Sequence, residues 1–324
     1  MAMRLASEFA RTWREGGARA LGRRLADRCA FEIRRIRERT DAAVRRARGI
    51  RARAGWRGVL AAARARVRYA VLRLLGRGQS EAALIEASSR YWNEGDKSGV
   101  DLGDFSHWVG TGPWQDRERW LRLGRVHRHM LDRLCTLTGA PRPRRMLEWG
   151  CGGGANAIHF IDDLEEFCGV EISQASLDEC RRVLVDAGFG GFRPLLVDAA
   201  APEQALQLGE GSYDCFLSAY VFELLPSKSY VARVLSVAAQ LLRPGGLALV
   251  QIRYDDGTAR SRQHHADYFR NSTRFTSFRV EDFWVQAERV GFRPEYVTLV
   301  PRRTEDYSGD LYAYFAMVKP AAAR

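Results

Sequence analysis

The chain has 324 residues, 46% of them hydrophobic and 28% charged, and a net charge of +12. This composition is typical of a globular protein with a packed core, and the length predicts two units or one large one. No run of about 18 apolar residues occurs, which excludes a membrane-spanning helix. Charged residues interrupt the N-terminal segment, so no secretory signal is expected. The six cysteines include no Cys-x-x-Cys pair, so we expect buried thiols in a reducing cytoplasm.

The positive charge is concentrated in the N-terminal segment, residues 1–78. This segment contains 22 arginines, no lysine and six acidic residues, so it carries +16 and leaves −4 on the rest of the chain. Its pattern is helical, and apolar residues recur at helical spacing along residues 56–74. The sequence therefore predicts an arginine-rich amphipathic arm, separate from the remaining domains.

Three partners would suit such an arm. A basic amphipathic helix binds an anionic membrane surface, or its apolar stripe packs on the catalytic domain or a second subunit. Arginines also bind nucleic-acid phosphates. The whole chain has only three lysines and the arm has few aromatic residues, which disfavours nucleic acid. Membrane attachment and self-association stay open, and attachment would place a cytoplasmic protein at the inner membrane surface.

Residues 79–140 are expected to form a helical cap. Two helices are predicted, over about 80–93 and 115–138, with an aromatic loop between them. His127 and His129 of the second helix are expected on its surface.

From residue 141 to 324, strand and helix patterns alternate. Apolar runs of strand length occur at 145–149, 167–172, 193–197, 213–218, 246–253, 294–300 and 311–318. Helix-patterned segments separate most of them, which indicates an α/β fold whose parallel sheet carries helices on both faces.

The most informative stretch is the glycine loop that follows the first of these strands. Gly150, Gly152 and Ala155 satisfy the dinucleotide pattern GxGxxG/A. Gly150, Gly152 and Gly154 together with Glu148 also satisfy (D/E)xGxGxG. An acid two residues before the first glycine fits poorly beside a pyrophosphate, but it suits a ligand with an ammonium group and a sulfonium. A helix is expected directly after the loop.

With this loop the chain resembles the class I methyltransferase superfamily, whose cofactor is S-adenosylmethionine. An Arg243-Pro-Gly-Gly turn before the fifth strand and two apolar runs after Gly291 match the same family. The resemblance covers about residues 80–319. It implies a Rossmann-like, seven-stranded, mostly parallel sheet, to which the arm adds an N-terminal helical extension.

The resemblance also implies a cofactor site. In the family, the acid at Glu148 lies near the methionine moiety, the acid at Glu171 takes the ribose hydroxyls, and the acid at Asp198 receives the adenine amino group. Glu171 would serve NAD equally well, or would cap a helix where no ligand binds. The expected cofactor residues are Glu148, Gly150, Gly152, Gly154, Glu171, Asp198 and Ser218.

An oxygen acceptor needs a base, and histidine suits neutral pH. Ligands bind outside the carboxyl ends of parallel strands, which directs attention to the polar segment 254–268 after the fifth strand. His264, His265 and Asp255 are the candidate bases there, and His107 in the aromatic loop is another. The alternative for 254–268 is a solvated insert without chemistry. No spacing matches a familiar metal-ligand pattern, so no metal is expected.

The sequence therefore predicts a methyltransferase that uses S-adenosylmethionine and acts on a small-molecule or glycan acceptor at oxygen. Two alternatives stay open. One is an RNA- or protein-directed methyltransferase tethered by the basic arm, and the other is a non-catalytic scaffold that binds the cofactor.

Overall fold

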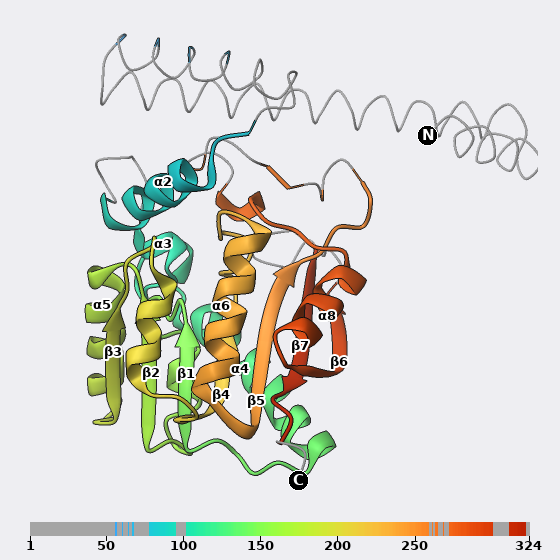
Figure 1. Cartoon of the computed structure of the whole chain (residues 1–324). Coiled ribbons are helices and arrows are strands. Elements are labelled where there is room, and N and C mark those ends of the chain that lie inside the picture. The colour runs from blue at the N-terminus through green and yellow to red at the C-terminus, as the bar shows by residue number, and fades with distance from the viewer. Residues whose placement is uncertain are drawn as a thin grey trace, which may run out of the picture. The chain divides into compact units, whose positions relative to one another are not determined.

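The computed structural model describes residues 78–94, 102–258, 272–300 and 311–321, together with Trp56, Leu60, Arg64, Val67, Ser261, Gln263, His264 and Tyr268. The chain from Gly78 onward forms one compact unit (Figure 1). Apart from four helical positions and Gly78, the predicted arm of residues 1–78 lies outside the described residues.

The helices and strands alternate along the chain. They are α2 (Glu81–Glu94), α3 (Leu102–Phe105), η2 (Gly112–Trp114), α4 (Arg117–Thr138), β1 (Arg145–Trp149), η3 (Ala157–His159), β2 (Glu166–Glu171), α5 (Gln174–Asp186), β3 (Phe192–Leu196), η4 (Pro202–Leu208), β4 (Tyr213–Ser218), α6 (Lys228–Leu241), β5 (Leu242–Arg253), η5 (Ser272–Arg274), α8 (Val280–Arg289), β6 (Arg293–Val300) and β7 (Tyr312–Val318). Within the described ranges, no helix combines the length and the apolar character that a membrane crossing requires.

The strands form one seven-stranded sheet in the order β3-β2-β1-β4-β5-β7-β6. Strands β1 to β5 are parallel, and β7 runs antiparallel to both of its neighbours. This confirms the predicted Rossmann-like fold class. Strand β5 begins at Leu242, earlier than predicted, because Leu242 already pairs with Tyr213 of β4 before the Pro-Gly-Gly turn.

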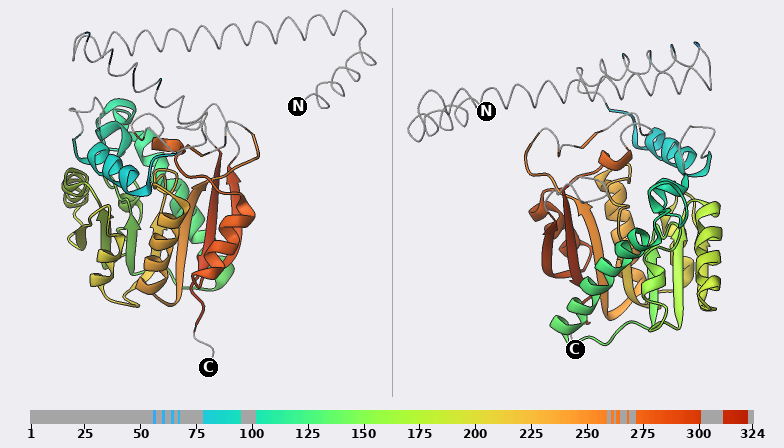
Figure 2. Two further views of the ribbon diagram at one scale, coloured as in Figure 1. Left: turned by 45° about the horizontal axis from the view of Figure 1, so that its top comes forward. Right: turned by 180° about the vertical axis from the view of Figure 1, so that it is seen from behind.

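Helices cover both faces of the sheet, as the tilted view and the view from behind show (Figure 2). Leu147 of β1 and Phe216 of β4 pack with α6 and α8 in one buried cluster. Their neighbours Met146 and Cys215 pack with α4 and α5 in the other cluster. Successive side chains of a strand point to opposite faces of the sheet, so β1 and β4 each contribute side chains to both layers of the core.

The segment predicted as a cap, residues 79–140, does not form a single layer. Helix α4 lies on the face of the sheet, where Leu131 and Leu134 join the buried cluster. His127 on this helix is only 1% exposed, so its predicted surface position is wrong, whereas His129 is exposed. The described residues of α2, α3 and the loop after them lie at the carboxyl ends of the strands (Figure 1).

The prediction of an α-helix directly after the glycine loop is wrong as well. Turns follow Gly154 instead, with the short 3-10 helix η3 among them. Helix α4 lies directly against this turn, because a Cβ atom on Gly124 would stand 2.3 Å from the carbonyl oxygen of Ala155. The space beside the loop is therefore filled by a helix that precedes the sheet in sequence.

Candidate active site

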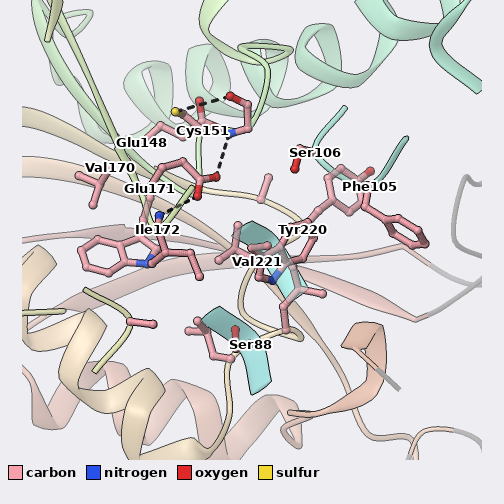
Figure 3. A pocket seen from close by; sticks show the side chains of 18 of the residues that line it. Ser88, Phe105, Ser106, Glu148, Cys151, Val170, Glu171, Ile172, Tyr220 and Val221 are labelled. Carbon is pink, nitrogen blue, oxygen red and sulfur yellow. Dashed lines mark hydrogen bonds between the residues drawn. The ribbon is translucent and has the colours of Figure 1, made fainter. Parts of the chain in front are cut away.

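A pocket lies at the carboxyl ends of β1, β2 and β4, with residues of α2 and α3 in its wall (Figure 3). It contains about 940 Å³ of empty space, part of it open to solvent. The strand order reverses between β1 and β4, and ligands of open α/β sheets bind at such a reversal.

The glycine loop forms one wall of the pocket. Gly150, Gly152 and Gly154 have φ angles of +76°, +51° and +82°, a region that residues with a side chain rarely adopt. A Cβ atom on Gly152 would stand 2.5 Å from the carbonyl oxygen of Ser106, and that oxygen accepts a hydrogen bond from the Gly153 N–H at 2.8 Å. The loop therefore closes against the segment that follows α3. Gly150 and Gly152 line the pocket, whereas Gly154 packs against α5.

Glu171, at the end of β2, faces the pocket and supports the loop. Its Oε1 accepts a hydrogen bond from the Gly152 N–H at 3.2 Å, and its Oε2 accepts one from the Ile172 N–H at 2.9 Å (Figure 3). Burial raises the pKa of this carboxyl group, and the backbone hydrogen bonds oppose the shift.

Glu148, in β1, is only 1% exposed and also lines the pocket. Its Oε1 accepts a hydrogen bond from Asn156 Nδ2 at 2.5 Å, while its Oε2 is buried without a hydrogen-bond partner among the described residues. Burial, with a smaller contribution from the charge of Glu171, raises the pKa of Glu148 to about 8. A buried carboxylate oxygen without a partner is costly, and a cationic ligand would satisfy it.

Besides Gly154, two predicted cofactor residues do not line the pocket. Asp198 is exposed, and its carboxylate accepts a hydrogen bond from the Ala200 N–H, so Val197 and Ala199 line the pocket in its place. The carboxylate turns back on its own backbone after β3, which a sequence pattern does not reveal. Ser218 is buried, and its hydroxyl donates to the Trp149 carbonyl oxygen across β1 and β4.

Of the described candidate bases, only His107 lines the pocket. Its ring contacts Trp114 and Tyr220 edge-on, with centroid distances of 4.9 and 5.4 Å. Burial, with a smaller effect from His127, lowers the pKa of His107 to about 4. The imidazole is therefore neutral at physiological pH.

The candidates after β5 lie elsewhere. Asp255 accepts hydrogen bonds from the Ser261 hydroxyl at 2.6 Å and from the Gly257 N–H at 2.9 Å, so its carboxylate closes a turn. His264 is bonded through its backbone to Arg274 and does not line the pocket. His265 lies outside the described residues. Among the residues that the structure describes, no group of three or more His, Cys, Asp or Glu side chains could hold a metal ion.

Sequence reasoning missed several residues of the pocket. Ile85, Ser88 and Trp92 on α2 line it, and their spacing places them on one face of that helix. That stripe was visible in the sequence. Tyr220 follows β4 with a φ of +59°, and its backbone N–H donates to Gln251 Oε1 at 2.5 Å. The sequence does offer Tyr220 as an aromatic candidate for the pocket wall, and the structure places it there, but no sequence pattern marks the pocket residue Asn156.

Comparison with known proteins decides the family. A family model described as a methyltransferase domain matches residues 119–297, more than half of the chain. The chain belongs to this methyltransferase family. This membership agrees with the class I resemblance, which implied S-adenosylmethionine as the cofactor.

The methyltransferase is also similar to individual proteins. Over 134 residues it is 27% identical to a ubiquinone biosynthesis O-methyltransferase of Bordetella avium, covering 41% of this chain and 52% of that protein. The chain thus spans about half the length of this curated relative. Among solved structures, a SAM-dependent methyltransferase of Methanosarcina mazei is 13% identical, with a TM-score of 0.46 over 56% of this chain and 95% of the other. The cyclase SpnF is 17% identical, with a TM-score of 0.45 over 60% and 81%.

The pocket of the methyltransferase fits its cofactor chemically. The Glu148 oxygen without a partner suits an ammonium group, and Glu171 suits a pair of hydroxyls. Val197, Ala199 and Ile172 supply apolar surface for a flat ring. These features match the amino-acid, ribose and base parts of S-adenosylmethionine.

The raised pKa of Glu148 predicts a pH dependence of stability. The folded protein keeps this proton up to about pH 8, whereas the unfolded chain releases it near 4.5. Between these values the folded state binds more protons, so the free energy of unfolding falls as pH rises. The lowered pKa values of His107 and His127 have the opposite effect below about pH 6.5. There the unfolded chain binds more protons than the folded state, so the free energy of unfolding rises with pH.

Glu148→Gln should remove this slope. Between pH 7 and 8, urea unfolding should show wild-type stability falling by about 1 kcal/mol more than that of Glu148→Gln. The exposed Glu203→Gln is the control and should follow the wild type. Parallel curves for wild type and Glu148→Gln would mean that Glu148 is already ionised at pH 7.

Proposed function

We propose that the methyltransferase binds S-adenosylmethionine in this pocket and transfers its methyl group to a hydroxyl oxygen of a small acceptor, a sugar or another hydroxylated molecule. The observation that carries the proposal is the position of His107. It is the one predicted base among the described residues that shares the pocket with the glycine loop, Glu148 and Glu171.

Each part of the pocket would hold a different part of the cofactor. Glu148 would accept the ammonium group through Oε2, and Glu171 would accept the ribose hydroxyls. Val197 and Ala199 would contact the adenine in place of the exposed Asp198. When bound, the sulfonium supplies an activated methyl group, so the protein mainly has to orient the acceptor and exclude water.

His107 and Tyr220 would orient the acceptor. A neutral imidazole accepts a hydrogen bond from a hydroxyl group and takes its proton as the oxygen is methylated. Phe105 and Tyr220 also line the pocket, and aromatic faces pack well on sugar or phenol rings (Figure 3). The similarity to an O-methyltransferase of Bordetella avium supports oxygen as the acceptor atom.

The cofactor site is tested by calorimetric titration of S-adenosylhomocysteine into the full chain. Glu171→Gln keeps the size of the side chain but removes its charge, so the affinity should fall about tenfold, or about 1.4 kcal/mol. Glu203→Gln, whose carboxylate is bound to Arg233 on the surface, should match the wild type. Equal affinities for wild type and Glu171→Gln would place the ribose elsewhere.

The acceptor chemistry is tested by release of S-adenosylhomocysteine with a panel of sugars, sugar phosphates, phenols and amines. His107 has a φ of +57°, and Asn tolerates this conformation, so His107→Asn leaves the backbone unstrained. For whichever hydroxylated acceptor the wild type methylates, kcat of His107→Asn should be about 100-fold lower than that of the wild type. The Kd for S-adenosylhomocysteine should stay within about twofold, and the exposed His129→Asn is the control. Turnover of amines alone would contradict an oxygen acceptor.

For the arm, we propose docking to an anionic membrane surface, which would place the enzyme at the cytoplasmic face of a membrane. Residues 1–78 carry +16, and Trp56, Leu60 and Val67 are helical positions with side chains 62%, 58% and 64% exposed. These three positions fall at helical spacing, which suits the interface of an anionic bilayer.

Co-sedimentation with vesicles tests the docking. The full chain should bind phosphatidylcholine vesicles that contain phosphatidylglycerol, but not phosphatidylcholine alone, and salt should weaken the binding. Leu60→Glu should weaken it several-fold, whereas Leu137→Glu, an equally exposed leucine of α4, should not. If the full chain does not bind the vesicles, and if Leu60→Glu abolishes a dimer that the wild type forms, the arm serves self-association instead.

A further inference from the structure

Behind the glycine loop lies a row of four buried polar side chains, Glu148, Asn156, His127 and Tyr314, which we call the buried polar chain. Asn156 Nδ2 lies 2.5 Å from Glu148 Oε1, Asn156 Oδ1 lies 2.7 Å from His127 Nδ1, and His127 Nε2 lies 3.0 Å from the Tyr314 hydroxyl. The four residues come from β1, the turn after the glycine loop, α4 and β7. The fold thus brings together residues that are far apart in sequence.

The hydrogen bonds of this chain have one consistent direction. Asn156 Nδ2 donates to Glu148 Oε1, which leaves the amide oxygen of Asn156 to accept from His127. His127 then donates from Nδ1, which leaves Nε2 to accept from the Tyr314 hydroxyl. Rotating the Asn156 amide by half a turn would place its oxygen against the carboxylate. His127, with its proton on Nδ1, therefore supports the orientation in which Asn156 donates to Glu148.

The buried polar chain is sealed from solvent. His127 and Glu148 are 1% exposed, Tyr314 is 4% and Asn156 is 8%. Burial lowers the pKa of His127 to about 4, so this ring stays neutral. Polar groups buried so deeply are retained where all of them are satisfied, and here one acceptor is left over, Oε2 of Glu148.

We propose that His127 is a positioning residue for ligand recognition. Through Asn156 it holds Glu148 Oε1, so that Oε2 stays available to the ammonium group of the ligand, and Tyr314 in turn holds His127. This inference rests on the proposed cofactor site. It makes the buried polar chain the determinant that favours ligands with an amino-acid moiety over the bare adenosine thioether.

The test compares two ligands that differ only in that moiety. S-adenosylhomocysteine carries the amino-acid group, and 5′-methylthioadenosine lacks it. Both are titrated calorimetrically into the full chain, and the preference is the ratio of their Kd values. In His127→Phe the preference should fall at least tenfold, while the Kd of 5′-methylthioadenosine changes less than twofold.

Two matched tyrosine variants separate positioning from packing. Tyr314→Phe removes the hydroxyl that holds His127 and that also bonds to Tyr220, and the preference should fall about threefold. Tyr296→Phe, on the neighbouring strand β6, removes a hydroxyl that donates to the Met130 carbonyl oxygen of α4, outside the buried polar chain, and both Kd values should be unchanged. Tyr314→Phe also keeps the test decisive if His127→Phe does not fold.

The outcomes distinguish this inference from the function on which it rests. If Glu148→Gln abolishes the preference but His127→Phe and Tyr314→Phe keep it, the buried polar chain has no part in recognition and only this inference fails. A parallel loss of affinity for both ligands in the folded variants would make the role purely structural and would also overturn it. If the wild type binds neither ligand, the proposed cofactor site is wrong, and the inference falls with it.

Discussion

The close approach of Ser106 to the glycine loop is the constraint on which the rest of the site depends. The Gly153 N–H donates to the Ser106 carbonyl oxygen, and no side chain could stand at Gly152 between the two segments. This contact brings the residues after α3 over the carboxyl ends of the strands, although they precede the whole sheet in sequence. His107 follows directly, so the same contact carries the candidate base into the pocket. Glu171 supports the arrangement from the opposite side, because its carboxylate accepts from the Gly152 N–H.

The site combines one ionisable end with one aromatic end. Glu148 and Glu171 lie beside the glycine loop, whereas His107, Phe105 and Tyr220 supply rings. A cationic cofactor and a ring-shaped acceptor would each find a matching surface there, with their reacting atoms between the two ends. The buried polar chain links the ends physically, since the ring of His127 also lies 5.8 Å from that of Tyr220.

Much of the fold follows from the sequence because the sheet is built from local patterns. Each apolar run became a strand, and the glycine loop formed where the spacing placed it. What failed were features that depend on contacts distant in sequence. Turns replace the helix expected after Gly154, and α4 packs against them; His127 is buried because the sheet lies beneath α4. Asp198 was placed correctly at the end of its strand, but the direction of its side chain depends on a local turn that periodicity does not describe.

Gly124 has a consequence for how this enzyme can vary. A glycine in the middle of a helix costs about 1 kcal/mol relative to alanine, so helix propensity alone would favour its replacement. A side chain there would press on the Ala155 carbonyl oxygen and would lie 3.0 Å from the Cα atom of Asn156, which holds Glu148. A stabilising substitution at this position and an intact site are therefore incompatible. Any gain in the helix propensity of α4 must therefore come from its other positions, because a side chain at Gly124 would disturb the active site.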